Sequence, residues 1–394
     1  MNVNIKNNSG QNVFAVIFGL NSSNQWCIYK DGVVHVCQTG ETTHQFFYSL
    51  SGTSNSLNLS DFPQLSSGVI LFSYNQFPNI FNIVPDGNGK PSVQSPPFVP
   101  GSGDANTIFN MVEFTYNSNG LNVDTTNVDY YSTPISINLI GTDSGHNSYN
   151  QSAGTMNYTR QEIFEKFDKE TSGTSFNKLL MKDSDGNYVR ILGPQHGVQS
   201  GYISNNLYDK YVNKCWSIYT KKKLNITTSI SAYTGTVDKS GDMCFTQKGD
   251  TTILYKLPKP GPGLAFDILG CCNSLAAPNN EEGAIVARIG AALNRTTLHN
   301  YNNQPFCSSE FFYPTGTTYP TNLYSKVLHE CYLGGNGYAF PFDDVCNVFS
   351  SDMGCYYPSE FNITLDEFSK GSQRTSCCSK WSQAIKKVTS YFKK

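Results

Sequence analysis

The sequence is poor in charged residues and lacks long hydrophobic runs. Asp, Glu, Lys and Arg make up 15% of its 394 residues, whereas about a quarter is usual in globular proteins. The formal net charge of -2 gives no electrostatic reason to expect nucleic acid or an anionic membrane as a partner. No apolar stretch approaches the ~20 residues of a membrane-spanning helix. We therefore expect no nucleic-acid partner and no membrane span.

Cysteine, by contrast, is abundant. None of the twelve cysteines forms a C-x-x-C pair, so we expect no metal site. Cys271 with Cys272 and Cys377 with Cys378 are vicinal, and each member is expected to bond elsewhere. An even cysteine count together with many N-x-S/T sequons is typical of a disulfide-bonded glycoprotein from the secretory route. We therefore predict that most or all cysteines are paired, and that the chain, which begins without a signal peptide, is a mature secreted form.

The first part of the chain, residues 1–141, has the pattern of a β-domain. Short apolar stretches alternate with turn residues and show no helical periodicity, which predicts a β-sandwich or jelly roll. We expect residues 337–367 to return to this domain and complete it, with strands at 338–345 and 361–365. The strand candidates in the first part are residues 13–20, 26–29, 33–36, 45–48 and 69–74.

The middle part, residues 142–336, has the mixed pattern of an inserted α/β domain. Thr159 is an N-cap signal ahead of apolar residues at helical spacing. The last part, residues 368–394, has an apolar stripe opposite lysines and predicts an amphipathic helical tail. The predicted fold class is therefore mainly β, a sandwich or jelly roll with an inserted mixed α/β domain. Further predicted elements of the insertion are helices at 281–293 and 324–331 and strands at 188–192 and 252–257.

One stretch gathers three acids in a chain with few charges. Residues 112–116 alternate apolar and polar side chains as a half-buried strand does, and N-S-N-G at 117–120 is hairpin turn chemistry. A two-residue turn would place Glu113 opposite Asp124, with roughly 5 Å between their Cβ atoms. Two carboxyl groups that close repel, which raises the pKa of one of them. A protonated acid beside an ionised base is what glycoside hydrolysis requires.

The same stretch carries a family resemblance. V-E-F-T-Y at 112–116, G-L at 120–121, T-x-V-D at 126–129 and P-I at 134–135 resemble the signature hairpin of glycoside hydrolase family 64, the laminaripentaose-producing β-1,3-glucanases. R-I-L-G-P, A-R-I-G-A-A-L-N-R and Y-A-F-P-F-D-D-V follow in the same order along the chain. The resemblance covers roughly residues 2–367. It implies a thaumatin-like β-domain, β-1,3-glucan as the substrate and no cofactor.

The resemblance also implies residue roles. The family's general acid falls on Glu113 and its base on Asp129, in an inverting reaction. Such a pair must lie roughly 6.5–9.5 Å apart, and the directly opposed Glu113 and Asp124 are too close for it. Because positions 124 and 129 differ by an odd number, a continuous strand would send them to opposite faces. A bulge at 125–127 would bring both to one cleft. The residues predicted to bind substrate are Thr115, Asn117, Asp124, Thr126 and Tyr130.

Some of these residues have a second interpretation. The three acids would also suit the exposed surface of a strand, and the ring of Tyr130 would suit either a sugar face or the core. His196, His299 and His329 are interpreted as structural, because no nucleophile is paired with any of them.

Two functions from different classes follow. The first is a secreted endo-β-1,3-glucanase, which the two retained acids favour. The second is a glucan-binding or cell-wall structural protein of thaumatin-like fold with little turnover. Asn122, which stands where bacterial family members commonly carry Trp, favours this second function, because losing the ring removes a stacking contact of about 1 kcal/mol. Either function implies a β-1,3-glucan partner and an extracellular, wall-associated location, and the sequence predicts no oligomeric state.

Overall fold

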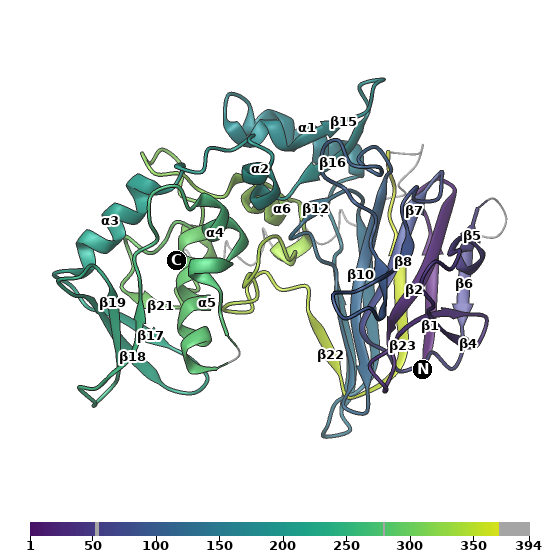
Figure 1. Cartoon of the computed structure of the whole chain (residues 1–394), viewed down its shortest axis with the longest axis horizontal. Coiled ribbons are helices and arrows are strands. Elements are labelled where there is room, and N and C mark those ends of the chain that lie inside the picture. The colour runs from purple at the N-terminus through teal and green to yellow at the C-terminus, as the bar shows by residue number, and fades with distance from the viewer. Residues whose placement is uncertain (52–54, 279, 370–394) are drawn as a thin grey trace, which may run out of the picture.

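The computed structural model describes residues 1–51, 55–278 and 280–369. A two-sheet β-sandwich lies at one end of the molecule and a helix-rich part with its own sheets at the other (Figure 1). After β14 (Ser148–Ala153) the chain runs through the helix-rich part, and it returns to the sandwich for β22 (Met353–Cys355) and β23 (Tyr357–Leu365). The fold is mainly β, as predicted. The predicted tail lies mostly outside the described residues.

The first sheet of the sandwich joins the beginning and the end of the described chain. β1 (Asn2–Asn7) lies parallel to β23, and the other neighbours in this sheet are antiparallel. The strand order is β14-β13-β23-β1-β6, where β13 is Ile135–Thr142 and β6 is Ser56–Leu59. Because β14 pairs with β13, this sheet continues beyond residue 141.

The second sheet carries the predicted hairpin. Its strand order is β22-β11-β10-β7-β2-β3-β4, and β5 pairs with β2. Alternation along β10 turns Val112 and Phe114 into the core between the two sheets, where they meet Val3 and Ile5 of the first sheet. The bounds are β2 (Val13–Leu20), β3 (Trp26–Lys30), β4 (Val33–Val36), β5 (Tyr48–Leu50), β7 (Ser66–Tyr74), β10 (Phe109–Asn117) and β11 (Gly120–Asp124).

The outer face of the second sheet has a covered half and a polar half. Phe109, Leu71 and Ile28 lie on this face in an apolar cluster with residues of a small hairpin, β8 (Asn82–Pro85) and β9 (Pro91–Gln94). Further along β10, the same alternation brings Glu113 and Thr115 to this face. The polar half is therefore where solvent or a ligand can reach the sheet.

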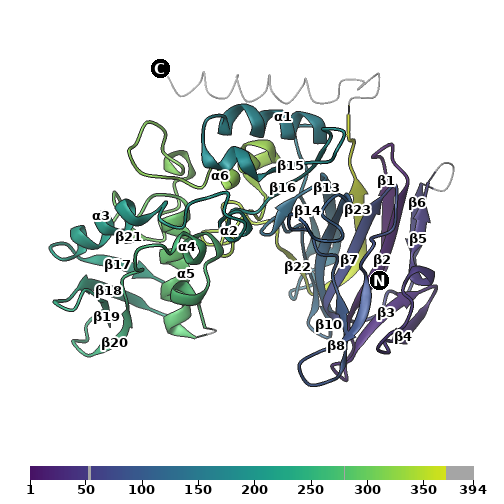
Figure 2. The same ribbon diagram turned by 45° about the horizontal axis from the view of Figure 1, so that its top comes forward.

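The helix-rich part contains two sheets and most of the helices. Helices α1 and α6 pack together and lie near the top of the sandwich in both views (Figures 1 and 2). No helix among the described residues is long and apolar enough to cross a membrane. The α-helices are α1 (Arg160–Thr171), α2 (Pro194–Gln199), α3 (Asp209–Tyr219), α4 (Ala265–Gly270), α5 (Glu281–Asn294) and α6 (Leu323–Cys331).

The two sheets of this part differ in size. The strand order is β12-β16-β15 in the smaller one and β20-β19-β18-β17-β21 in the larger. Their bounds are β12 (Tyr130–Tyr131), β15 (Leu180–Lys182), β16 (Tyr188–Leu192), β17 (Leu224–Thr227), β18 (Ala232–Val237), β19 (Met243–Gln247), β20 (Ile253–Leu257) and β21 (Asn303–Gln304). Short 3-10 helices are η1 (His44–Phe46), η2 (Ser175–Leu179), η3 (Asn273–Leu275), η4 (Ser309–Phe311) and η5 (Leu333–Gly335).

Local sequence signals predicted three of the six α-helices of the described residues, namely α1, α5 and α6. Thr159 accepts a hydrogen bond from the backbone of Glu162, whose side chain accepts one from the backbone of Thr159, which is a complete capping box. The helices predicted at 281–293 and 324–331 are confirmed as α5 and α6.

Two predicted strands are wrong. Of residues 45–48, the first two lie in η1 and only Tyr48 belongs to a strand, as the first residue of β5, while 338–345 is a series of turns with one isolated bridge at Tyr338. In the second case Pro341 has no N–H to donate to a ladder. The carboxylate of Asp343 accepts the N–H of Ala339 instead.

The prediction that most cysteines are paired is also wrong for the described residues. One disulfide, Cys307–Cys346, is present, and eight cysteines are free. Cys215 and Cys331 are fully buried and behave as small hydrophobic residues. Burial raises the pKa of each thiol to about 12, which makes it unreactive. The free thiols Cys271 and Cys272 form no disulfide, and Cys377 and Cys378 lie outside the described residues.

Candidate active site

The β10–β11 hairpin has the predicted register. Glu113 lies opposite Asp124, and Asn117 lies opposite Gly120. The side chain of Asn117 accepts the N–H of Asn119 at 2.8 Å, and Gly120 has a φ of 107°, which a residue with a Cβ rarely adopts. The turn chemistry therefore fixes which acids face each other.

The chain then leaves the sheet instead of forming a bulge. β11 ends at Asp124, and the next strand, β12, pairs with β16 in the small sheet of the helix-rich part. We call residues 125–129 the crossing segment. It places Asp129 at the junction of the two parts, so the odd spacing between 124 and 129 no longer decides which way Asp129 faces. The predicted bulge at 125–127 is replaced by a change of sheet.

Backbone and tyrosine contacts hold the crossing segment. Asn127 donates its backbone N–H to Tyr338 at 2.8 Å, and its carbonyl accepts the hydroxyl of Tyr324 at 2.5 Å. The amide of Asn127 also bonds the hydroxyl of Tyr332. Ser351 donates to the carbonyl of Thr125 at 3.0 Å. Each of these partners comes from outside the hairpin.

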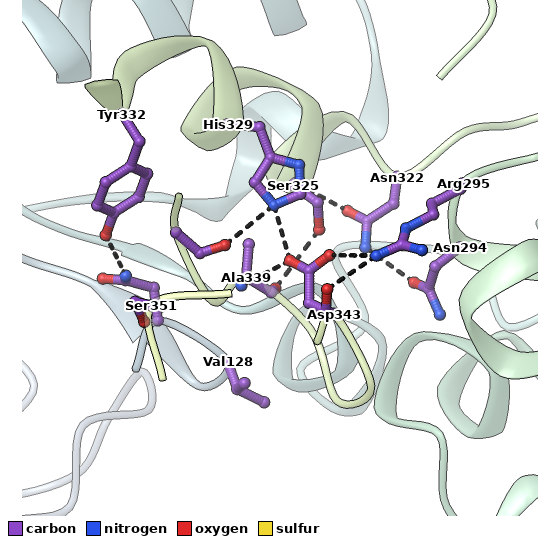
Figure 3. A network of polar contacts seen from close by, with 12 residues as sticks. Val128, Asn294, Arg295, Asn322, Ser325, His329, Tyr332, Ala339, Asp343 and Ser351 are labelled. Carbon is purple, nitrogen blue, oxygen red and sulfur yellow. Dashed lines mark hydrogen bonds and ion pairs between the residues drawn. The ribbon is translucent and has the colours of Figure 1, made fainter. Parts of the chain in front are cut away.

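A buried ionic network supports the loop that contains Tyr338. The carboxylate of Asp343 contacts His329 at 2.7 Å, Arg295 at 3.2 Å and the N–H of Ala339 at 3.0 Å (Figure 3). The side chains of Asp343 and His329 are 0% and 4% exposed. The interpretation of His329 as structural is consistent with this position, because both side chains are almost wholly buried.

The polar half of the sheet holds an open pocket of about 410 Å³. Glu113, Thr115, Asn122 and Asp124 line it from the hairpin, and Asp352 lines it from the segment before β22. Its other lining residues are Trp26, Ser67, Gly68, Val69 and Phe114. The pocket therefore brings together two of the three predicted acids and one further carboxyl group.

The carboxyl groups of the pocket hold their protons more tightly than usual. Burial raises the pKa of Glu113, and the nearby charge of Asp129 raises it further. Burial likewise raises the pKa of Asp124, with smaller contributions from Glu113 and Asp352, to about 8. We expected Asp124 to be the neighbour that raises the pKa of Glu113. The effect instead comes from burial and Asp129, and Asp124 itself is neutral at pH 7.

Asp129 lies in a different environment, with 44% of its side chain exposed. Its Oδ1 accepts hydrogen bonds from His196 Nε2 at 2.7 Å and from Gln195 Nε2 at 3.2 Å. Both residues belong to α2, which begins at Pro194. No described residue donates to Asp129 Oδ2. One oxygen is therefore held by the protein and the other is available to a water molecule.

The remaining predicted substrate-binding residues are not in the pocket. Asn117 uses its side chain to cap the turn, and Thr126 forms a bridge with Tyr338. Tyr130 is 3% exposed, and its ring packs against Phe109 at 5.5 Å between centroids. This position matches the core interpretation of Tyr130 and offers no ring face to a sugar.

Sequence reasoning missed His196, Gln195, Trp26 and Asp352. His196 had been interpreted as structural, but it contacts the predicted base. A signal was present, because the strand-forming R-I-L is followed by G-P and then Gln195 and His196, so both side chains come directly after a strand. Polar residues at a strand end are frequent in functional sites. Their approach to a residue 67 positions away is a product of the tertiary fold.

Comparisons with known proteins agree on one family. The family of β-1,3-glucanases termed glycoside hydrolase 64 matches residues 1–365. Glucan endo-1,3-beta-glucosidases from Cellulosimicrobium cellulans and an Arthrobacter species are each 32% identical over 312 residues, which is 78% of this chain and 53% of theirs. The chain thus spans about half the length of the curated relatives it matches.

Solved structures show the same fold. A laminaripentaose-producing β-1,3-glucanase in complex with laminaritetraose is 26% identical, with a TM-score of 0.80 over 94% of this chain and 99% of that one. A β-1,3-glucanase domain from Clostridium beijerinckii is 20% identical, with a TM-score of 0.76 over 93% and 98%, and is similar in fold. Since the family match spans almost the whole described chain, this protein belongs to the glycoside hydrolase family 64 of β-1,3-glucanases.

Proposed function

We propose that the protein is an endo-β-1,3-glucanase that cleaves β-1,3-glucan with inversion, using Glu113 as general acid and Asp129 as general base. The observation that carries the proposal is the contrast between the two carboxyl groups. Burial and the charge of Asp129 raise the pKa of Glu113, whereas Asp129 is partly exposed and accepts two hydrogen bonds. A buried carboxyl group with a raised pKa beside a second, more exposed carboxyl group is the usual basis for assigning the acid.

The reaction assigns one proton transfer to each residue. Glu113 donates its proton to the glycosidic oxygen as the bond to the anomeric carbon breaks. Asp129, through its free Oδ2, takes a proton from the water whose oxygen bonds to that carbon on the opposite face of the sugar. His196 and Gln195 keep the carboxylate of Asp129 oriented through Oδ1. The products are a glucan chain with a free hydroxyl group at the former glycosidic oxygen and a second chain whose new anomeric hydroxyl has the inverted configuration.

The rest of the pocket suits a neutral polyhydroxylated ligand. Thr115 and Asn122 offer uncharged donors and acceptors. Asp124, neutral below about pH 8, can donate a hydrogen bond from its carboxylic acid to a sugar hydroxyl. We retain Asp124 and Thr115 as the substrate-binding residues with the strongest geometric support.

A glucan-binding protein with little turnover is the second candidate. Asn122 supports it, since this pocket residue lacks the aromatic ring that a stacked sugar would use. The two candidates differ in whether Glu113 and Asp129 act chemically or only shape a binding surface.

We also propose an extracellular, wall-associated location, supported by the size of the polymeric substrate. The cysteine argument for secretion no longer supports it, because eight described cysteines are free. Two of the sequon asparagines, Asn7 and Asn294, are buried, so glycans could attach only elsewhere. Antibody labelling of intact cells against permeabilised cells tests the location, and labelling only after permeabilisation would contradict it.

Hydrolysis of laminarin and curdlan, followed as release of reducing ends, tests the proposed function. The configuration of the newly formed anomer, read by proton NMR in the first minutes, tests inversion. Wild-type protein that binds both glucans but releases no reducing ends between about pH 4 and 8, the range in which catalytic carboxyl pairs usually work, would favour the binding-protein function.

A further inference from the structure

Trp26 borders two separate hollows. It is the first residue of β3, and it lines the candidate active site that contains Glu113. It also lines a second hollow of about 520 Å³ between the β2–β3 turn and the β8–β9 hairpin. Its ring lies 6.1 Å from that of Phe18 and is only partly buried. Trp26 therefore stands between the two spaces and borders both.

The second hollow has the chemistry of a carbohydrate site. Ser23, Asn24 and Gln25 bring uncharged hydrogen-bonding groups, and Lys90 is its one charged side chain among the described residues. Its apolar walls are Val36, Cys37 and Pro91, next to the indole of Trp26. Sugars are held by aromatic faces and neutral donors and acceptors, so this lining suits a polyol better than an anion or an apolar ligand.

The two hollows lie along a line that crosses the strands. The order from the acid to the tryptophan is β10-β7-β2-β3, which is three strand spacings, or roughly 14 Å. Val69 of β7 lines the candidate active site between Glu113 and Trp26. A glucan of several sugar units that occupies the active site and extends in this direction would reach the second hollow.

We propose that Trp26 and the second hollow form a distal glucan-binding subsite that holds the part of a long β-1,3-glucan chain lying outside the candidate active site. The proposal rests on the proposed function, because it takes the same polymer as ligand. The subsite makes affinity depend on the length of the ligand. Oligosaccharides too short to reach past Trp26 gain no affinity from the subsite, whereas longer ones do.

Binding of laminari-oligosaccharides from the triose to the octaose, measured by calorimetry, tests the subsite. The parent protein carries Glu113→Gln so that ligands are not cleaved. The deciding variant is Gln25→Ala with Lys90→Ala, since these exposed residues line the second hollow and not the candidate active site. We expect it to bind the octaose about three- to tenfold more weakly, while triose binding is unchanged. Trp26→Ala should weaken octaose binding by at least as much.

A matched control carries Gln161→Ala with Lys178→Ala, two exposed residues of the helix-rich part. It should bind every length as the parent does. If the parent prefers the octaose and the Gln25/Lys90 variant keeps that preference in full, the distal subsite is wrong and the proposed function stands. An equal loss for triose and octaose would also overturn the subsite. A parent that binds no length at all would overturn the proposed function itself.

Discussion

Two Asp–His pairs in this protein have the same geometry and different surroundings. Asp129 and His196 lie 2.7 Å apart at the edge of the candidate active site, with 44% and 20% of their side chains exposed. Asp343 and His329 also lie 2.7 Å apart, with 0% and 4% exposed. The buried carboxylate is further bound by Arg295 and by the N–H of Ala339 (Figure 3). The exposed one keeps an oxygen without a donor among the described residues.

The difference shows that the contact alone does not identify a functional residue. A carboxylate whose acceptors are filled and whose charge is matched inside the protein stabilises a fold. A carboxylate with one oxygen held and the other open to water is prepared to take a proton. Four predictions test and extend this distinction, from the largest expected effect to the smallest.

Replacing either proposed catalytic carboxyl group, Asp129 or Glu113, should have the largest effect on catalysis. Asp129→Asn removes the base and Glu113→Gln removes the proton donor, so we expect kcat to fall by about 10²–10⁴-fold in each. Initial rates of reducing-end release from laminarin give kcat, and curdlan sedimentation should show that both variants still bind glucan. Wild-type rates in Glu113→Gln would contradict the assignment of the acid.

Removing the charge of the buried pair should instead affect folding. Asp343→Asn leaves the guanidinium of Arg295 without its carboxylate, and breaking such a buried pair costs about 3–5 kcal/mol of unfolding free energy. Urea unfolding measures this loss. Well below the melting temperature, kcat should stay near the wild-type value. A stable Asp343→Asn protein with a large loss of kcat would reverse the comparison.

His196 should contribute to rate more than to stability. His196→Ala removes one hydrogen bond to the charged base, which is worth about 1.5–3 kcal/mol, or roughly 10- to 150-fold in kcat. The unfolding free energy should drop by about 1 kcal/mol or less, because the pair is partly exposed. The matched variant His196→Gln keeps a donor and should recover part of the rate. An unchanged kcat in His196→Ala would show that the hydrogen bond from His196 is not needed to orient the carboxylate of Asp129.

Asp124→Asn should have the smallest effect at pH 4, and this effect should grow as pH rises. The folded-state pKa of Asp124 is about 8, above its ordinary value of 3.8, so the native protein binds more protons than the unfolded chain between these values. The stability contributed by the protonated acid is complete below about pH 4 and is lost as pH rises toward 8. Asp124→Asn, which stays neutral, should melt like wild type at pH 4 and higher than wild type at pH 8. A melting difference at pH 4 as large as that at pH 8 would contradict this.

The hairpin could be predicted because its determinants are local. N-S-N-G at 117–120 fixes the turn, and the turn fixes that Glu113 faces Asp124. The capping box at Thr159 and Glu162 is equally local. Residues within a few positions of each other carry these signals, so no knowledge of the fold is needed.

The change of sheet after Asp124 could not be predicted in this way. It depends on the hydrogen bonds that Asn127 forms with Tyr338 and Tyr324, two residues about 200 positions further along the chain. The pairing of Asp129 with His196 arises from the same long-range packing. The prediction that most cysteines are paired failed for a related reason. An even number of cysteines does not tell how close any two sulfur atoms lie in the fold.

The crossing segment also has a mechanical consequence. Glu113 is carried by the sandwich, and Asp129 is carried by the small sheet of the helix-rich part. The gap between acid and base is therefore set by how two bodies dock, whereas in a simple hairpin it would be set by strand spacing. An inverting glycosidase works only within a gap of roughly 6.5–9.5 Å. Substitutions where the two parts pack together, at residues other than Glu113 and Asp129, can thus adjust that gap while both catalytic side chains stay as they are.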